Sequence, residues 1–449
     1  MPTNEELKQR ACEAIERHKG ELVAVAKTVL ENPETGFHET KTSKLVSEQF
    51  QRMGIPHRKG LALTGVKGEV QGGGGPGPRV SVIGELDSLL VPEHPNSDSI
   101  TGAAHACGHH AQIGMMLGAM VGLQSPEVLP HLSGTLVPFA VPAEEFVQVE
   151  GRMALRDQGR IEFMSGKQEL ISLGEFDDVD MAIMCHTASD MGKGAFAVGG
   201  TSNSHMVKYI EFIGKGAHAG GSPHLGINAL NAACWSIMAI HSTRETFPES
   251  DTVRLHGIIA RGGESVSAVP SDIRLEWRVR SGTPQAVARN GEKIDRCFKA
   301  GALALGAKVR ITNIPGYMPV INNPDIQALF KDNAGVLVGQ DKVIQMKPTR
   351  NRGGSTDMGD LSQLIPACHP YAGGAMGSGH SKDYKIRDYE MAVVNPAKTM
   401  AMTVIDLLAE GAAGAKGVLD GWKPAMTKEQ YLAFQRERAR VVEFDGGDG

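Results

Sequence analysis

The chain has 449 residues, of which 41% are hydrophobic and 22% are charged. This composition is typical of a globular protein, and the length allows two or three domains that each bury a core. The 51 acidic residues exceed the 46 basic ones, so the formal net charge is -5. That balance provides neither a basic field for nucleic acid nor a polybasic patch for a membrane surface. We therefore expect a small-molecule ligand, with no nucleic acid and no membrane as partner.

The cysteines and the N-terminal residues indicate a cytoplasmic protein. Six cysteines are spread over the chain without a CxxC pair, which favours reduced thiols over a disulfide scaffold. The first residues are polar and charged, and they lack the apolar core of a secretory signal. No stretch reaches the roughly 18 apolar residues of a membrane span.

The N-terminal part of the chain alternates predicted helices with buried strands, which is an α/β pattern. Residues 4–53 predict two helices, because the Pro and Gly of the segment Asn32–Gly36 interrupt the helical pattern. Apolar runs further along predict three strands, at 79–84, 134–141 and 181–186, and a buried helix at 112–123.

From about residue 199 the pattern changes to strands around two helices, which predicts an inserted α+β module. Its expected strands are 206–213, 252–259, 272–280 and 308–314, and its expected helices are 228–241 and 285–305. Three more helices are expected near 324–336, 395–410 and 428–442.

The segment from His105 to His110 contains three imidazoles and one thiol. Thiolate and neutral imidazole suit Zn²⁺ or a similar first-row divalent metal, whereas Mg²⁺ and Ca²⁺ prefer sites made of oxygen atoms. Asp87, Glu145 and His186 each follow a predicted strand, which is where an open α/β sheet places its ligand site. We therefore expect a metal-dependent hydrolase site at the carboxyl ends of these strands.

Glu144 and Glu145 are adjacent carboxylates that suit metal-assisted hydrolysis, in which one residue binds metal and the other transfers protons. The alternative is a solvated acidic pair after a strand. His105 and His110 are interpreted as metal ligands, as donors to a ligand, or as ordinary residues at the start of a helix. Cys185 is interpreted as a residue of the core.

Several motifs recur in an order that carries a resemblance to a known family. They are Asn32-Pro-Glu-Thr-Gly, Gly84-Glu-Leu-Asp, His105-Ala-Cys-Gly-His, Pro142-Ala-Glu-Glu, Gly214-Lys-Gly-Ala-His, Gly354-Ser-Thr-Asp and Gly379-His. In these motifs the chain resembles the M20 metallopeptidases over residues 5–410. The resemblance is to their amidohydrolase branch, which includes aminobenzoyl-glutamate, hippurate and indoleacetyl-amino-acid hydrolases.

The resemblance implies an α/β catalytic domain, similar to zinc exopeptidases, with a mixed sheet flanked by helices. An α+β lid domain would interrupt it and mediate a homodimer or a higher homo-oligomer. The predicted domains are a catalytic domain of residues 1–198 and 316–415, a lid and dimerisation domain of residues 199–315, and a C-terminal tail of residues 416–449, expected to be a surface appendage.

The resemblance also implies a site for one or two divalent metal ions, Zn or Mn. Cys107 would bridge two metals in the place that a carboxylate fills in related branches. The implied ligands are Cys107, His109, Glu145, His186 and His380.

The resemblance further assigns roles in catalysis and in substrate binding. Glu144 would be the general base, and Asp87 would orient a ligand imidazole. His218 would hydrogen-bond the oxyanion, in relatives often from the lid of the partner subunit. Arg280 and Ser267 would bind the substrate, the arginine through a carboxylate.

Some of these positions have simpler interpretations or depart from the family pattern. His218 in a glycine-rich loop is otherwise an ordinary surface residue, and Arg280 is otherwise a surface charge on a strand. His110 and Gln112 stand where many amidohydrolases have Asp and a later His, and Ser267 stands where they often have Asn. The altered positions are expected to affect substrate contacts.

The sequence thus predicts a metal-dependent hydrolase of a C–N bond, with attack by a metal-activated water and a glutamate as general base. The predicted bond is the amide of an N-acyl or N-aroyl amino acid, similar to aminobenzoyl-glutamate. One alternative is hydrolytic deamination of an aromatic amino acid such as a nitroanthranilate. Another is a non-catalytic protein that binds metal or carboxylate, although a closed structural zinc site needs no free carboxylate beside it.

Overall fold

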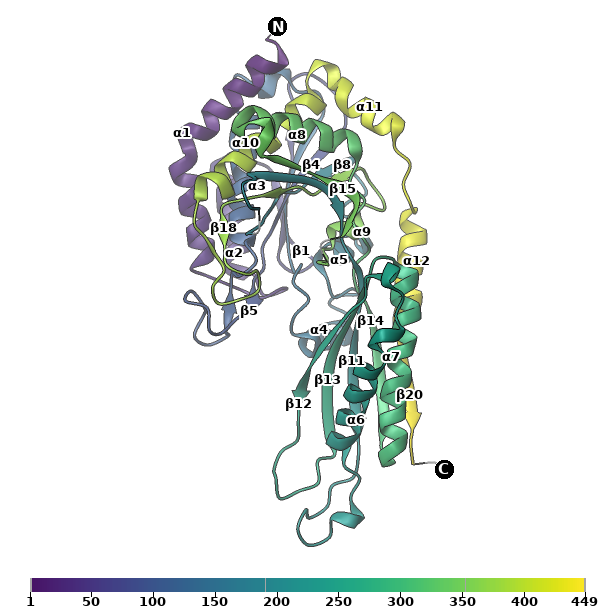
Figure 1. The fold of residues 1–449 in the computed structure, drawn as a ribbon. Coiled ribbons are helices and arrows are strands. Elements are labelled where there is room, and N and C mark those ends of the chain that lie inside the picture. Colours follow the sequence, from purple (N-terminus) through teal and green to yellow (C-terminus); the bar gives the residue numbers. More distant parts are fainter. Residues whose placement is uncertain (1, 190, 352, 448–449) are drawn as a thin grey trace. The chain divides into compact units, whose positions relative to one another are not determined.

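The computed structural model describes residues 2–189, 191–351 and 353–447 of the chain. These residues form two compact units, whose elements are labelled in Figure 1. Both units combine helices with sheets, which confirms the predicted α/β class. Unit 1 comprises the described residues of 1–201, 320–350 and 360–427, and unit 2 those of 202–319, 351–359 and 428–447.

The division into units follows the expected domains except in two segments. The chain passes from unit 1 to unit 2 after residue 201 and returns after residue 319, close to the expected boundaries. Residues 351–359, which were expected in the catalytic domain, belong to unit 2. The expected tail is divided, because residues 416–427 belong to unit 1 and residues 428–447 to unit 2.

The main sheet of unit 1 has a parallel centre and antiparallel strands at one edge. Its order is β1-β2-β7-β4-β8-β16, with β3 also paired to β7. β4 runs parallel to β7 and β8, whereas β2 and β3 run antiparallel to β7. The strands are β1 (His57–Leu61), β2 (Gly65–Gly68), β3 (Val70–Gln71), β4 (Arg79–Glu85), β7 (Thr135–Val141), β8 (Met181–Ile183) and β16 (Ala367–Cys368).

A second sheet of unit 1 has the order β15-β10-β17-β9, and two short strand pairs lie outside both sheets. The strands of the second sheet are β15 (Val343–Asn351), β10 (Phe196–Thr201), β17 (Tyr371–Ala372) and β9 (His186–Thr187). The short pairs are β5 (Leu89–Leu90) with β6 (Ala103–Ala104), and β18 (Ala375–Met376) with β19 (Lys385–Ile386).

Helix α3 lies at the centre of the core of unit 1. Nearly all of its residues are buried, as its apolar composition predicts. Gly118 allows a neighbouring helix to approach, because a Cβ there would lie 2.7 Å from Cβ of Ala397. The helices of this unit are α1 (Asn4–Leu30), α2 (Thr40–Arg52), α3 (His109–Leu123), α4 (Val149–Asp157), α5 (Gly166–Ser172), α8 (Pro324–Val338), α10 (Asn395–Leu408) and α11 (Ala413–Gly421), and α9 (Met358–Leu361) spans a unit boundary.

One helical segment of unit 1 is long and apolar enough to cross a membrane. The segment Glu390–Leu408 includes α10, and 78% of its most apolar window is buried inside the protein. Such burial is typical of the core helix of a globular domain.

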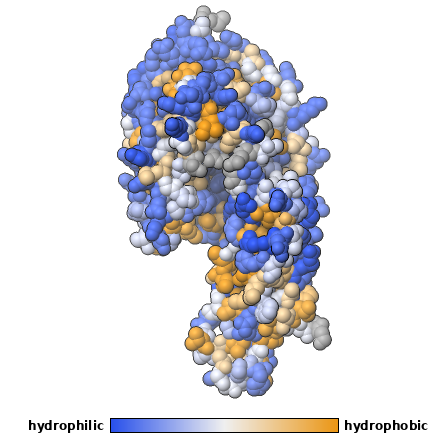
Figure 2. All heavy atoms as spheres, in the orientation of Figure 1, coloured by the Kyte–Doolittle hydropathy of each residue, from blue (hydrophilic) through white to orange (hydrophobic). Residues whose placement is uncertain are grey.

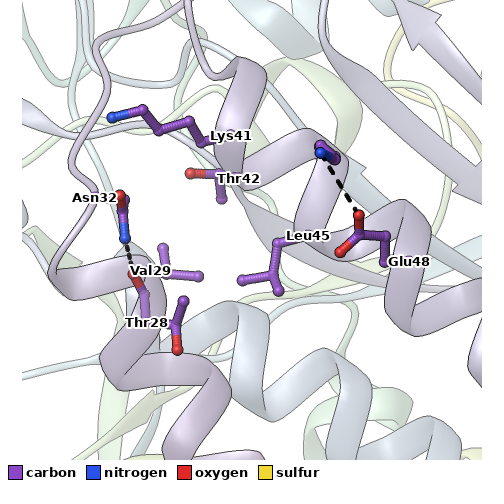
Figure 3. A pocket seen from close by; sticks show the side chains of 8 residues that line it. Thr28, Val29, Asn32, Lys41, Thr42, Leu45 and Glu48 are labelled. Atoms are coloured by element: carbon purple, nitrogen blue, oxygen red, sulfur yellow. Dashed lines mark hydrogen bonds and ion pairs between the residues drawn. The ribbon is translucent and has the colours of Figure 1, made fainter.

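The segment between α1 and α2 has a capping role, and a pocket of about 300 Å³ lies between the two helices (Figure 3). The Asn32 amide donates to the carbonyl oxygen of Thr28 at 2.9 Å. The Glu34 carboxylate accepts the backbone N–H groups of Lys41 and Thr42 at 3.0 Å, which stabilises the N-terminus of α2. The Asn-Pro-Glu-Thr-Gly motif therefore joins two helices, as its turn residues predict.

Unit 2 is built on a five-stranded antiparallel sheet with the order β12-β13-β11-β14-β20. Alternate residues of β13 are buried, and Leu275, Trp277 and Val279 pack with Phe298 of α7 in the core. The elements are β11 (Ser204–Ile213), α6 (Ala229–Ser242), β12 (Arg254–Arg261), β13 (Asp272–Ser281), α7 (Pro284–Leu305), β14 (Lys308–Pro315), α12 (Lys428–Arg438) and β20 (Arg440–Asp445).

The C-terminal segment is an integral part of unit 2. β20 pairs with β14 over residues 440–445, where the sequence analysis expected the end of a helix. Tyr431 of α12 is fully buried, and the Arg438 guanidinium donates to the carbonyl oxygen of His205 at 3.0 Å. The strand satisfies backbone groups of β14 that would otherwise form a sheet edge.

We predict that Tyr431→Ala lowers the free energy of unfolding by about 3 kcal/mol or more, because it removes a fully buried aromatic side chain and leaves a cavity. Urea denaturation followed by tryptophan fluorescence measures the change. Val441→Ala in β20 is the control, since Val441 is 57% exposed and its truncation should change stability by less than about 0.5 kcal/mol. Equal stability of Tyr431→Ala and the wild type would contradict the integral role of the segment.

Candidate metal centre

Three neighbouring parallel strands of the main sheet position the candidate site. β4 pairs in parallel with both β7 and β8, so the carboxyl ends of the three strands lie along one edge. Each of these ends is followed within four residues by polar residues of the site. Glu85 is the last residue of β4 and Asp87 follows it, Glu144 and Glu145 follow β7, and His186, the first residue of β9, follows β8.

The five predicted ligands come together as two groups that share Cys107. Within each group, one ligand atom from every residue lies within 4.8 Å of the others. Sγ of Cys107 lies 3.3 Å from Nε2 of His186, and Nε2 of His380 lies 3.4 Å from Oε1 of Glu145. The groups are Cys107, His109 and His186, and Cys107, Glu145 and His380. A thiol common to both groups has the position that a bridging ligand requires, while the ligand roles stay predictions.

Backbone carbonyls fix the orientation of two of these imidazoles. Nδ1 of His109 lies 2.9 Å from the carbonyl oxygen of Asp87, and Nδ1 of His186 lies 2.6 Å from that of Thr187. A carbonyl oxygen only accepts, so each Nδ1 carries a proton and donates it. In the neutral rings, Nε2 therefore has a free lone pair, which is the form that binds metal.

Gly108 allows Cys107 and His109 to turn into the site together. It precedes α3 with a φ of 105°, in the left-handed region that glycine adopts without strain. A Cβ at this position would collide with the hydroxyl oxygens of Thr187 and Tyr384. The glycine of the Cys-Gly-His motif is therefore required by the geometry of the loop.

Asp87 links two of the predicted ligands. Its Oδ2 accepts the backbone N–H of Glu145 at 2.7 Å, and its Oδ1 lies 3.3 Å from Nδ1 of His109. The carboxylate is fully buried. These contacts are those that the predicted orienting role needs.

Two residues that the sequence analysis did not single out support the loop after β7. Ala143 has a φ of 53°, which is unfavourable for a residue with a side chain. Its backbone N–H donates to Oε1 of the buried Glu39 at 2.8 Å. The buried Arg152 donates to the backbone carbonyl of Glu145 at 2.5 Å. Nothing in the local sequence marks Arg152, because its hydrogen bonds to the carbonyl oxygens of Glu145 and Met164 depend on how the chain folds between them and not on a sequence motif.

The electrostatics of the site favour a cation. Burial and the nearby Glu145 carboxylate raise the pKa of the Cys107 thiol well above its usual range. Although burial alone lowers it, the pKa of His109 is raised well above its usual range by Glu85 and Cys107. Burial and the charge of His109 lower the pKa of His186 to about 4. Negative groups thus surround the imidazoles, as a divalent metal requires.

The donor set also fits a metal on hydrogen-bonding grounds. Among the described residues, Nε2 of His109, Oε1 of Glu145 and Oε2 of Glu85 are buried without a hydrogen-bond partner. Such atoms are costly inside a protein unless a cation or ordered water satisfies them. A thiolate, imidazoles and a carboxylate are ligands of Zn²⁺ and of similar first-row metals, so the residues present fit a divalent metal.

Glu85 and Lys167 form a buried ion pair beside this site, and neither was predicted to belong to it. Nζ of Lys167 lies 2.6 Å from Oε1 of Glu85, and Oε2 of Glu85 lies 3.1 Å from Nε2 of His109. Although burial raises it, the charges of Lys167, His109 and His186 lower the pKa of Glu85 to about 2. The sequence did contain a signal that Glu85 belongs to the site. It stands two residues before Asp87, and alternate residues of an extended segment point to the same side. Lys167 had no such signal.

The predicted residues of the lid lie in unit 2, and two of them are neighbours. The backbone N–H of Ala219 donates to the carbonyl oxygen of Ser267 at 2.9 Å, next to His218. His218 is exposed, and its Nδ1 accepts the backbone N–H of Gly221 at 2.8 Å. Arg280 ends β13, where its guanidinium donates to the hydroxyl of Ser355 at 3.3 Å.

His105 and His110 are buried beside the site but belong to neither ligand group. Their ring centroids lie 5.4 Å apart. Burial, together with other histidines, lowers the pKa of both, that of His110 to about 3. They therefore remain neutral.

The comparison with known families agrees with this geometry. A family model described as Peptidase family M20/M25/M40 matches residues 82–405. The chain belongs to this family. The predicted resemblance is confirmed, as is the predicted enzyme class, a metal-dependent amidohydrolase. The matched range covers most of unit 1 and all but the C-terminal segment of unit 2.

Individual M20 relatives resemble the chain over most of its length. The Xaa-Arg dipeptidase of Mus musculus is 27% identical over 438 residues, which cover 95% of this chain and 94% of the relative. The IAA-amino acid hydrolase ILR1-like 2 of Arabidopsis thaliana is 28% identical over 384 residues, which cover 82% of this chain and 81% of the relative. The solved structure of the Bacillus subtilis YXEP protein, a dinuclear metal binding peptidase, is similar with a TM-score of 0.62 and 20% sequence identity. The similarity covers 88% of this chain and 99% of that protein.

We predict that Asp87→Asn weakens metal binding about 10- to 100-fold, because residues that orient a ligand typically contribute that much to affinity. Competition with a chromophoric chelator measures the affinity. The control is Asp180→Asn, since the Asp180 carboxylate also accepts a backbone N–H, that of Arg79 at 2.7 Å, at the amino end of β4. Equal metal affinity of Asp87→Asn and the control would refute the orienting role.

Proposed function

We propose that this M20 enzyme hydrolyses the amide bond of an N-acyl or N-aroyl amino acid with one or two divalent metal ions, Zn or Mn. The observation that carries the proposal is the pair of ligand groups that share Cys107, with a further carboxylate beside them. That carboxylate belongs to Glu144, whose Oε2 lies 3.9 Å from Nε2 of His109. The metal is held by Cys107, His109, Glu145, His186 and His380.

Glu144 is the general base in this proposal. A divalent metal held by these residues would supply a Lewis acid for the substrate carbonyl and would lower the pKa of a water molecule. Glu144 accepts a proton from the attacking water at a carboxylate oxygen and later donates it to the leaving nitrogen. The next residue, Glu145, donates its backbone N–H to the Asp87 carboxylate. This hydrogen bond fixes the position of Glu144 relative to the predicted ligands.

His218 donates a hydrogen bond to the developing oxyanion. Its Nδ1 accepts backbone N–H groups of Gly220 and Gly221, so the proton of the neutral ring resides on Nε2. The exposed Nε2–H is then available as a donor. Arg280 and Ser267 bind the substrate, the arginine through a carboxylate, for which its planar guanidinium is suited.

The names of two relatives support an amide of an amino acid. The dipeptidase is named for an Xaa-Arg bond, and the plant relative is named for an amino acid conjugate. Both names describe hydrolysis at a bond to an amino acid. We propose a cytoplasmic enzyme, consistent with its scattered cysteines.

We predict that Glu144→Gln keeps the fold and the bound metal but loses turnover by about 10²- to 10⁴-fold, the usual contribution of general acid–base catalysis. Steady-state kinetics with metal content measured in parallel tests this. The matched control is Glu150→Gln, an exposed carboxylate in the first turn of α4, which should keep wild-type rates. Undiminished activity of Glu144→Gln would exclude it as the base.

A substrate panel tests the reaction itself. Enzyme loaded with Zn²⁺ or Mn²⁺ is incubated with N-acyl amino acids, aminobenzoyl-glutamate and aminobenzoic acids, and released amino acid and ammonia are quantified separately. Amino acid release is the expected result. Ammonia without amino acid would instead assign the enzyme to hydrolysis of aromatic amines.

The proposed assembly is a homodimer formed through unit 2. β12 is at one end of the sheet order, and large apolar side chains are exposed on it and on α6. Trp235 is 58% exposed, Met238 62% and Ile258 61%. Figure 2 shows hydrophobic side chains over this part of unit 2. Exposed apolar groups together with an unpaired strand edge support association of two copies.

We predict that the double variant Trp235→Glu/Met238→Glu shifts the protein from dimer to monomer, since two charges would have to be buried in the interface. Light scattering coupled to size-exclusion chromatography measures the mass. Leu303→Glu is the control, because Leu303 is 60% exposed on α7 of the same unit and lies outside the proposed interface. A double variant that remains dimeric would place the interface elsewhere.

A further inference from the structure

The buried pair of Glu85 and Lys167 is an unusual feature of unit 1. Both side chains are fully buried, and Nζ of Lys167 lies 2.6 Å from Oε1 of Glu85. Two ionised groups in a protein interior are costly to desolvate, and apolar residues of the same volume are often at least as stable. The pair therefore calls for a role other than stability.

Only one oxygen of Glu85 is occupied by the lysine. Oε2 has no hydrogen-bond partner among the described residues and lies 3.1 Å from Nε2 of His109, which also has none. Because Nδ1 of His109 donates to a carbonyl, Nε2 is the ring atom that faces this oxygen. A cation lies between two such atoms, and a divalent metal bound to both would take the place of the proton that Nε2 carries without it.

A second carboxylate lies in the same place. Oxygen atoms of Glu85 and Glu144 and a ring nitrogen of His109 all lie within 4.8 Å of one another. Like charges in a buried site cannot both stay ionised without a compensating cation. Lys167 compensates part of this charge from the side of Oε1, and the three remaining atoms lie close enough together to hold one metal ion.

We infer that Glu85 is a further ligand of the metal centre, and that Lys167 offsets part of the charge of its carboxylate. Glu85 contributes Oε2 to the metal that Nε2 of His109 binds. Because Oε1 is held by Lys167, the carboxylate binds metal through a single oxygen. This inference rests on the proposed function for the existence of the metal centre, but it adds a ligand to that centre.

The test measures metal binding, without substrate, for Glu85→Gln and Lys167→Met. Zn²⁺ affinity is determined by competition with a chromophoric chelator, Zn²⁺ content by mass spectrometry, and the ligand field by the visible spectrum of the Co²⁺ form. Glu85→Gln should weaken one bound metal at least about tenfold and change the Co²⁺ spectrum. Lys167→Met should bind metal at least as tightly as the wild type, because it removes a positive charge and keeps the ligand.

Two matched controls separate metal binding from general stability. Glu169→Gln alters a buried carboxylate on α5, the helix that also contains Lys167. The Glu169 carboxylate accepts the backbone N–H groups of Glu162 and Phe163 and is not part of the ligand groups. Lys67→Met removes another fully buried lysine, which is paired with Asp178. Both controls should keep wild-type metal affinity whatever they do to the melting temperature.

The outcomes are distinct. Weaker binding in Glu85→Gln but not in Lys167→Met supports the inference, since only a ligand gives effects of different sign in the two variants. Unchanged affinity in Glu85→Gln, or an equal loss in both variants together with lower melting temperatures, would overturn it and leave the proposed function intact. Wild-type protein that binds no divalent metal would overturn the proposed function as well.

Discussion

The parallel pairing of β4 with β7 and β8 is the constraint on which the rest of the site depends. Side-by-side strands of one direction end at one edge, so residues far apart in the sequence, such as Asp87 and Glu145, are in contact there. α3 begins at the same edge and adds Cys107 and His109. A reversal of any one strand would move its ligands to the opposite end of the sheet.

Around this edge, backbone groups hold most of the site in place. Carbonyl oxygens fix the rings of His109 and His186, and the Asp87 carboxylate holds the backbone N–H of Glu145. Ala143 keeps its strained conformation because Glu39 accepts its N–H. The ligands are therefore positioned before a metal arrives, which lowers the cost of assembling the site on binding.

Much of this could be predicted from the sequence because the signals are local. Apolar runs marked the strands, the turn residues of Asn32–Gly36 marked the break between α1 and α2, and the His105–His110 segment marked two residues, Cys107 and His109, that the structure brings together with His186. Lys167 gave no local signal, since its partner Glu85 is distant in the sequence, and Arg152 gave none because it binds backbone carbonyl oxygens, which any sequence provides. β20 was missed because its charged segment continues directly from the helix α12, and only the free edge of β14 makes it a strand.

The acidic groups at the site suit the one or two divalent metal ions that we propose for it. Five acidic groups lie at or beside it, namely Cys107, Glu85, Asp87, Glu144 and Glu145, and all but the half-buried Cys107 are buried. With the thiol ionised on metal binding, divalent ions together with the charge of Lys167 would offset negative charge of these groups in the interior. Neutral His105 and His110 contribute nothing to this offset. Cys107, which belongs to both predicted ligand groups, lies where a bridging thiol would be expected.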